Sequence, residues 1–147
     1  MNTSKRFLYW WQQIHSSVSR ELSLLLLVHL DGINSHIASL TDFNDLNQLF
    51  TSIAAGLEEG GYAIFSLENV SIENEKRLNK LKPDWRWQLT PSGRVAHRKE
   101  YVSLTAKSHS LETVLYEKLD AFRRENGKDV RGHMFVLQKQ AHAKDEL

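Results

Sequence analysis

The spacing of apolar residues predicts two helices in the first half of the chain. Residues 5–20 place large apolar side chains three and four positions apart, which is the pattern of one buried helical face. Residues 46–57 repeat that spacing, and Thr41 and Asp42 before them are residue types that cap helices. Residues 31–41 are polar and are expected to form a loop.

Compact apolar runs predict buried strands. Residues 21–30 are rich in leucine and end at Asp31, so they suit a strand buried on both faces, although leucine is equally common in helices. Residues 62–67 are apolar and directly follow Gly60 and Gly61. A helix, a pair of glycines and a buried strand form the helix-to-strand step of a parallel sheet, so a parallel strand is expected here.

The last third of the chain predicts a helix followed by an antiparallel hairpin. Residues 97–109 have a weak helical pattern, whereas residues 111–122 and 130–139 have the composition of strands. Asn126 and Gly127, which lie between these strands, are typical of a tight hairpin turn.

Residues 69–95 are polar and basic and contain both prolines of the chain. They are expected to form a long loop outside the sheet, and loops of this length often serve as functional lids. The predicted fold class is therefore α/β, with one or two parallel strands, flanking helices and a terminal antiparallel hairpin.

The composition limits the class of protein. The chain has 147 residues and no cysteine, so one domain is expected, and disulfides, thiolate metal sites and cysteine nucleophiles are excluded. No apolar run reaches the ~18 residues that cross a bilayer, and polar residues interrupt any signal-peptide core near the start. We therefore expect a cytoplasmic protein without a membrane partner.

The charge is unevenly distributed, although the net charge is only +1. Residues 31–75 contain eight acidic and no basic residues, whereas residues 76–99 contain eight basic residues and one acidic residue. The basic segment includes Trp85 and Trp87, so it would suit an anion or RNA. The alternative is that this segment faces the acidic one or is simply solvated. We expect the alternative, so nucleic acid is not the expected partner.

Three segments resemble a known enzyme family. Residues 57–68 resemble the segment leading into the fifth strand of class I S-adenosylmethionine-dependent methyltransferases, where leucine, Lys-Pro-Gly-Gly and an apolar strand follow one another; Glu58 and Glu59 replace Lys-Pro here. Residues 87–97, read as Trp-Gln-Leu-Thr-Pro-Ser-Gly-Arg-Val-Ala-His, are similar to a segment of predicted methyltransferases that are often fused to tetratricopeptide repeats. Those proteins close with arginine, glutamate, glycine and a short strand, and residues 124–137 are similar.

The resemblance covers residues 43–139 and implies a Rossmann-like sheet of seven strands. In the family, a glycine-rich loop after the first strand holds S-adenosylmethionine. This chain contains no Gly-x-Gly. We therefore expect the C-terminal half of such a sheet in residues 41–141, a divergent helix and strand in residues 1–40, and a frayed tail in residues 142–147. Residues 1–40 are either a family remnant or unrelated sequence joined by truncation or a frame change.

The expected function follows from this missing half. Methyl transfer depends on positioning the donor and the acceptor, so a partial methyltransferase that keeps only the acceptor-side lid is expected to be inactive alone. S-adenosylmethionine is the cofactor of the family, and this chain alone is expected to bind no cofactor. The alternative is a non-catalytic interaction module that pairs with a second copy or a partner chain through an open sheet edge.

The resemblance places four candidate residues on the acceptor side, namely Trp87, Ser92, Arg94 and His97. His97 is the candidate general base, and Arg94 is suited to the carboxylate or phosphate of an anionic small-molecule substrate. The alternative is structural, with Ser92 or His97 capping the following helix and Pro91 beginning a turn. No metal site is expected, because no two of the seven histidines have the helical spacing of zinc ligands.

Overall fold

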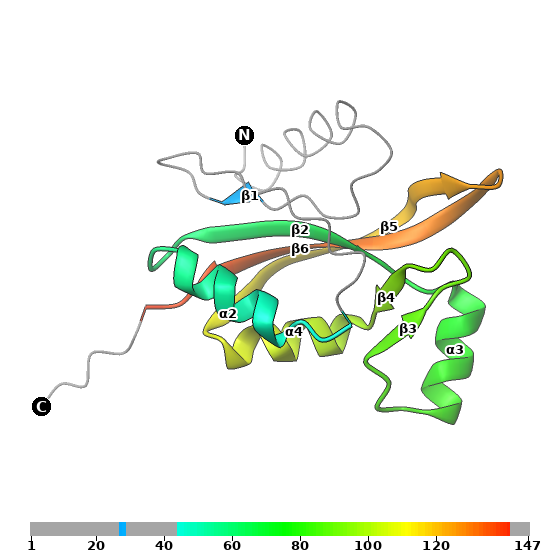
Figure 1. Ribbon diagram of the computed structural model, residues 1–147, viewed down its shortest axis with the longest axis horizontal. Coiled ribbons are helices and arrows are strands. Elements are labelled where there is room, and N and C mark those ends of the chain that lie inside the picture. The colour runs from blue at the N-terminus through cyan, green and yellow to red at the C-terminus, as the bar shows by residue number, and fades with distance from the viewer. Residues whose placement is uncertain (1–26, 29–43, 142–147) are drawn as a thin grey trace, which may run out of the picture.

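The structure is a computed structural model that describes residues 27, 28 and 44–141, and these residues form a mixed sheet flanked by three helices (Figure 1). The α/β class is therefore confirmed. The described helices are α2 (Asn47–Gly56), α3 (Ile72–Leu81) and α4 (Lys99–Ser108). The strands are β1 (Leu27–Val28), β2 (Tyr62–Glu68), β3 (Trp87–Leu89), β4 (Val95–His97), β5 (Leu111–Glu125) and β6 (Lys128–Lys139).

Five strands follow the order β3–β4–β2–β6–β5, and β1 pairs with β2 as well. β2 is antiparallel to β6 along its whole length and antiparallel to β1, and it is parallel to β4 only where Glu68 pairs with Ala96. The expectation of a parallel sheet around residues 62–67 is therefore wrong for most of the strand. The apolar run shows that the strand is buried, but it carries no information about which segment pairs with it.

Helix α2 begins later than the sequence predicts. Its N-cap residue is Leu46, and the Asp45 carboxylate accepts a hydrogen bond of 2.8 Å from the backbone N–H of Asn47. The predicted caps Thr41 and Asp42 lie outside the described residues, as do the predicted helix 5–20, the loop 31–41 and the tail 142–147. The predicted strand 21–30 overlaps the described residues only in β1.

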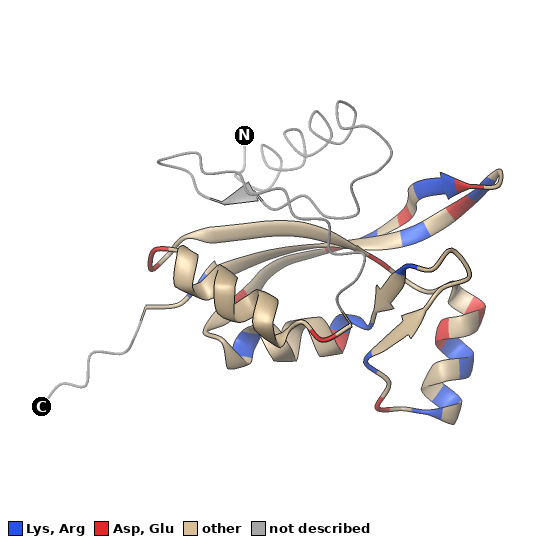
Figure 2. Cartoon of the chain, viewed as in Figure 1, with Lys and Arg blue, Asp and Glu red and all other residues tan. Residues whose placement is uncertain are grey.

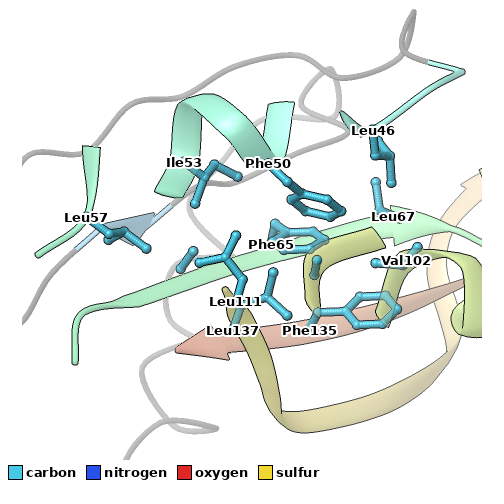
Figure 3. Packing of buried hydrophobic residues seen from close by; sticks show 12 residues of the cluster. Leu46, Phe50, Ile53, Leu57, Phe65, Leu67, Val102, Leu111, Phe135 and Leu137 are labelled. Atoms are coloured by element: carbon cyan, nitrogen blue, oxygen red, sulfur yellow. The ribbon is translucent and has the colours of Figure 1, made fainter. Parts of the chain in front are cut away.

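The main core lies between the sheet and the two helices α2 and α4 (Figures 1 and 3). Phe65 on β2 is at its centre, with ring centroids 5.9 Å from Phe50 on α2 and 5.5 Å from Phe135 on β6. Burial of these rings supplies most of the apolar contact that holds the helices on the sheet. The whole cluster is Leu46, Phe50, Ile53, Leu57, Ala63, Phe65, Leu67, Val102, Ala106, Leu111, Phe135 and Leu137.

The end of α2 is fastened to β6 by a side chain. The ammonium group of Lys139 donates hydrogen bonds of 2.6 Å to the carbonyl oxygen of Ala54 and 2.8 Å to that of Leu57. These carbonyls have no partner within the helix, so a cation satisfies both their hydrogen bonding and the negative end of the helix dipole.

Replacing Lys139 with methionine is therefore expected to lower the free energy of unfolding by about 1–3 kcal/mol, because hydrogen bonds to a charged donor are lost. Urea denaturation measures this value. The matched control is Lys107→Met at an exposed position on α4, and an equal loss in both variants would refute the cap.

The C-terminal hairpin is confirmed, with strands longer than the predicted 111–122 and 130–139. Asn126 and Gly127 have φ angles of 49° and 75°, as a tight hairpin turn requires. Register shifts in β5 lie between Thr113 and Leu115 and between Leu119 and Arg123. A Cβ atom on Gly132 would lie 2.5 Å from Cγ of Phe122, so glycine is needed where this ring packs across β6.

Residues 69–95 do not form the predicted loop, because they contain α3, β3 and the start of β4. The side chain of Ser71 caps α3 by accepting a hydrogen bond of 3.2 Å from the backbone N–H of Asn74. Trp85 is buried with Val70 and Ala96 in a small separate cluster. Only three such apolar residues are needed to fasten the segment to the sheet, which is too few to produce a periodic pattern.

Candidate functional site

A groove with a volume of about 540 Å³ opens where β2 and β5 end. Its walls are residues 68–71 after β2, residues 88–92 between β3 and β4, and residues 125–131 around the β5–β6 turn, together with Asn74 of α3. We call it the strand-end groove. The groove is thus formed largely by strand ends and turns at one edge of the sheet, and binding residues are disproportionately found on loops that a rigid sheet positions.

A buried ion pair supports one wall of the strand-end groove. Arg123 Nη2 lies 3.0 Å from Oε2 of Glu68, whose side chain is only 5% exposed. The same nitrogen donates to Glu125 and to the hydroxyl of Ser92, both at 3.2 Å. Burial would lower the pKa of Arg123, but its bonds to Glu68 and Glu125 outweigh this effect and raise the pKa above its ordinary value. One guanidinium therefore joins β2, β5 and the β3–β4 turn.

The remaining lining of the strand-end groove is rich in amide and hydroxyl groups, from Asn69, Asn74, Gln88, Thr90, Ser92 and Asn126. Asn69 is only 7% exposed, and its side-chain oxygen accepts a hydrogen bond of 2.8 Å from the backbone N–H of Val70. Arg131 donates to the carbonyl oxygen of Val70 at 2.9 Å and to Glu75 at 3.3 Å. Most of the exposed lining is nevertheless apolar, from Val70, Leu89, Pro91 and Val130. The groove is thus suited to a molecule with an apolar surface and a few hydrogen-bonding groups at its edge.

The structure brings together two of the four candidate residues, Trp87 and His97, which pair across β3 and β4 and both contact Tyr101, but it does not place them with Ser92 in the groove. Ser92 lines the strand-end groove, whereas the ring of Trp87 packs edge-on against Tyr101 of α4 at 5.5 Å. Arg94 is half-buried and does not line the groove. His97 is 0% exposed, with Nε2 3.2 Å from the carbonyl oxygen of Asn44 and its ring stacked on Tyr101. A role for His97 as general base therefore stays a prediction.

The predicted capping role of Ser92 or His97 is wrong. The N-cap residue of α4 is Arg98, and no side chain makes a capping hydrogen bond there. His97 is instead the last residue of β4, and the Ser92 hydroxyl lies 2.8 Å from that of Thr90. The predicted turn is present, since Gly93 has a φ of 80° and its N–H donates to the carbonyl oxygen of Thr90.

A second groove of about 460 Å³ lies beside α4, and we call it the α4 groove. Its lining includes Trp85, Arg86, Arg98 and Tyr101. The Arg98 guanidinium lies 6.0 Å from the centroid of the Trp85 ring and forms an ion pair of 3.0 Å with Glu100. Burial raises the pKa of Tyr101. Since Arg98 is already held by these groups, the α4 groove is the weaker candidate for ligand binding.

Sequence reasoning missed Glu68, Asn69 and Arg123. Glu68 ends an otherwise apolar strand, and a charged residue in that position signals either the end of burial or a buried ion pair. Its partner Arg123 is 55 residues away in the chain, so no local pattern could have connected the two residues.

A buried histidine lies on the face of the sheet that the helices cover. His133 on β6 has Nδ1 3.2 Å from the hydroxyl of Tyr116, and the ammonium of Lys99 lies 4.1 Å from the centroid of the Tyr116 ring. Burial, with smaller contributions from His97, Arg131 and Lys99, lowers the pKa of His133 to about 3. Burial also raises the pKa of Tyr116 to about 12. Both side chains are therefore neutral at physiological pH.

Acid is expected to destabilise the fold through His133. Folding lowers the pKa of His133 from 6.5 to about 3. Between about pH 3 and pH 6.5, His133 therefore carries a proton in the unfolded chain but not in the folded chain. Stability is therefore complete above about pH 6.5 and decreases as the pH falls toward about 3. Urea denaturation across this range should show a shallower decrease for His133→Gln than for His109→Gln, and equal slopes would contradict the assignment.

Among the described residues, no group of three or more His, Asp and Glu side chains could hold a metal ion. None of the helices in this part of the chain is long and apolar enough to cross a membrane. Gly60 and Gly61 precede β2 and so lie at its amino end, away from the strand-end groove. Comparisons with protein-family models, curated proteins and solved structures give no match for the chain. Its function is therefore argued from the groove.

Proposed function

We propose that residues 44–141 are the acceptor-binding part of an S-adenosylmethionine-dependent methyltransferase, with the strand-end groove as the acceptor site. One observation carries this proposal. The three segments that resemble the family, residues 57–68, 87–97 and 124–137, all contribute to the lining of the same groove although they are separate in sequence, the first of them through Glu68. Their contact runs through Arg123, which joins Glu68 of the first segment to Ser92 of the second.

The strand-end groove is suited to hold an acceptor in a fixed orientation. Methyl transfer is an in-line displacement, so its rate depends on how firmly the acceptor is oriented toward the donor. Asn69 is nearly buried and Ser92 is fastened by Arg123. An acceptor that hydrogen-bonds to these two side chains would therefore rest against a fixed wall.

In this proposal the chain binds the methyl acceptor and does not bind the methyl donor. Its 147 residues contain no Gly-x-Gly, which is the backbone feature that lets a loop approach the donor closely. We expect calorimetric titration with S-adenosylmethionine to give only heat of dilution. Saturable binding of S-adenosylmethionine would contradict this part of the proposal.

The acceptor site can be tested by nuclear magnetic resonance. A panel of small amines, alcohols, carboxylates and nucleosides is titrated into labelled protein, and the backbone amide signals of Asn69 and Ser92 are followed. At least one chemical class should shift both signals. The variant Ser92→Phe, which places a large side chain on the groove wall, should abolish the shift of the Asn69 signal, whereas Ser108→Phe in the α4 groove should not.

Three outcomes would overturn the acceptor site. They are shifts confined to Trp85 and Leu104 in the α4 groove, an equal loss of binding in both phenylalanine variants, and no shift with any compound. The carboxylate arm also tests the expectation of an anionic substrate, for which Arg94 was the candidate. Arg94 does not line the groove, whereas Lys128 and Arg131 do, so we expect any preference for carboxylates to be the same in an Arg94→Gln variant.

A second candidate function is pairing through the sheet edge. Strand β5 has 15 residues and pairs with β6 on one side, and no described residue pairs with its other side. Such an edge can add a strand from a second copy or a partner chain. Light scattering over a wide concentration range tests this function: a dimer that forms with concentration supports it, and a constant monomer contradicts self-pairing.

A further inference from the structure

Helix α3 is a basic surface helix, and none of its residues is fully buried. Lys76, Arg77 and Lys80 are exposed, and Figure 2 shows basic residues along this helix, with acidic residues in its first turn. Lysines four residues apart lie on the same face of a helix, so Lys76 and Lys80 stand beside each other. The helix therefore presents a compact positive surface, although the net charge of the chain is only +1.

Glu73 and Glu75 lie in the first turn of α3, but no ion pair of the described residues joins an acidic side chain to Lys76, Arg77 or Lys80. The ion pairs in this part of the chain join other arginines to acidic residues, and the only one that involves α3 is between Glu75 and Arg131. The Arg77 guanidinium donates to the amide oxygen of Asn74, at 2.7 and 3.2 Å, instead of to a carboxylate. The basic segment was expected either to face the acidic segment or to be solvated, and the exposed Lys76, Arg77 and Lys80 agree with solvation of α3. Its cations remain available to an anionic partner.

The positive surface leads directly into the strand-end groove. Asn74, which holds Arg77, is itself part of the groove wall, and the exposed Lys128 lines the groove from the hairpin turn. The acidic residues of the lining, Glu68, Glu125 and Asp129, are paired with Arg123 or Arg124. The lysines of α3 and Lys128 therefore stand beside a groove whose polar lining includes the amide groups of Asn69 and Gln88. Side-chain amides both donate and accept hydrogen bonds, which matches the edge of a nucleobase.

We infer that the strand-end groove takes a nucleobase from a single-stranded nucleic acid, and that α3 holds the phosphates beside it. The inference rests on the proposed acceptor function of the groove and names its substrate class. A single strand fits because an unpaired base leaves its edge free for side chains, whereas a duplex hides that edge in pairing and stacking. Phosphate contacts supply affinity and position, and the groove supplies contact with the base.

The test is fluorescence anisotropy with labelled oligonucleotides: single-stranded RNA, single-stranded DNA of the same sequence, and the corresponding RNA duplex. Both single strands should bind more tightly than the duplex. With three phosphate contacts, the logarithm of the association constant should fall against the logarithm of salt concentration with a slope of about −2. The RNA and DNA arms show whether the sugar contributes.

Reversing the charge of two lysines tests whether α3 contacts the phosphates. The double variant Lys76→Glu/Lys80→Glu should lose about tenfold or more in affinity and reduce the slope to about −0.7, because two of the three contacts are removed. The matched control is Lys107→Glu/Lys118→Glu, which reverses two exposed lysines on α4 and β5. An equal loss in the two double variants would overturn the inference, as would duplex binding that equals single-strand binding.

A separate measurement tests whether a base enters the strand-end groove. Single-stranded RNA should shift the amide signals of Asn69 and Ser92 in wild-type protein, and it should leave the Asn69 signal unshifted in Ser92→Phe. If oligonucleotides do not bind but a small molecule from the panel shifts these signals, the nucleic-acid inference fails and the acceptor site stands. If nothing reaches the groove, both fail.

Discussion

Replacing Arg123 with methionine is expected to lower the free energy of unfolding by about 3–5 kcal/mol, because it leaves a buried carboxylate without its partner. Glu68 has a side-chain exposure of 5% and Arg123 of 16%, so water can replace little of the lost interaction. The measurement is urea denaturation at neutral pH, with the midpoint and slope fitted separately.

The adjacent arginine provides the control. Arg124 forms an ion pair of 3.1 Å with Asp129, but both side chains are largely exposed, so Arg124→Met should cost less than about 1 kcal/mol. The double variant Glu68→Met/Arg123→Met should recover most of the loss, because it removes both buried charges. If the two single arginine variants were equally stable, the wall of the strand-end groove would not depend on this ion pair.

Phe135→Ala is expected to lower the free energy of unfolding by about 3–5 kcal/mol, because a cavity forms at the centre of the core. Phe135 is 0% exposed, and its ring centroid lies 5.5 Å from that of Phe65, 5.0 Å from Tyr116 and 4.9 Å from His133. These neighbours belong to the rigid sheet, so they cannot close the cavity fully. Urea denaturation again gives the value.

The matched control for the core is Leu104→Ala on α4. Leu104 is 68% exposed, so its removal should change the free energy of unfolding by less than about 0.5 kcal/mol. A loss below about 1 kcal/mol for Phe135→Ala would mean that the helices are not held on the sheet by this cluster.

The sequence predicted the parts of the fold that local signals encode. The stripe of apolar residues identified α2, the compact run after Gly61 identified β2, and Asn126 and Gly127 identified the turn of the hairpin. In each case the signal lies within the element itself. For these elements, the local propensity of the residues and the burial of one face both favour the same secondary structure.

The parts that the sequence did not predict depend on distant contacts. Residues 69–95 fold into α3, β3 and the start of β4 because Trp85 packs on Val70 and Ala96, and one tryptophan in a polar segment predicts no such docking. The orientation of β2 relative to its neighbours was wrong for a similar reason, since burial fixes no partner.

The candidate site was predicted only in part. The turn at Gly93 was found from its composition, and Ser92 on that turn does line the strand-end groove. His97 was chosen for its chemistry, but its place on β4 buries it completely. Glu68 and Arg123 were missed, because the ion pair exists only once the β5–β6 hairpin has packed beside β2.

The central proposal is that the strand-end groove holds an acceptor while the chain itself holds no methyl donor. Crystals of the chain soaked with S-adenosylmethionine, together with the compound that most strongly shifts the Asn69 and Ser92 signals, test both halves at once. Our account predicts density for that compound in the groove, within hydrogen-bonding distance of Asn69 and Ser92, and none for the donor. Density for S-adenosylmethionine enclosed by a single copy, or a groove that stays empty, would contradict it.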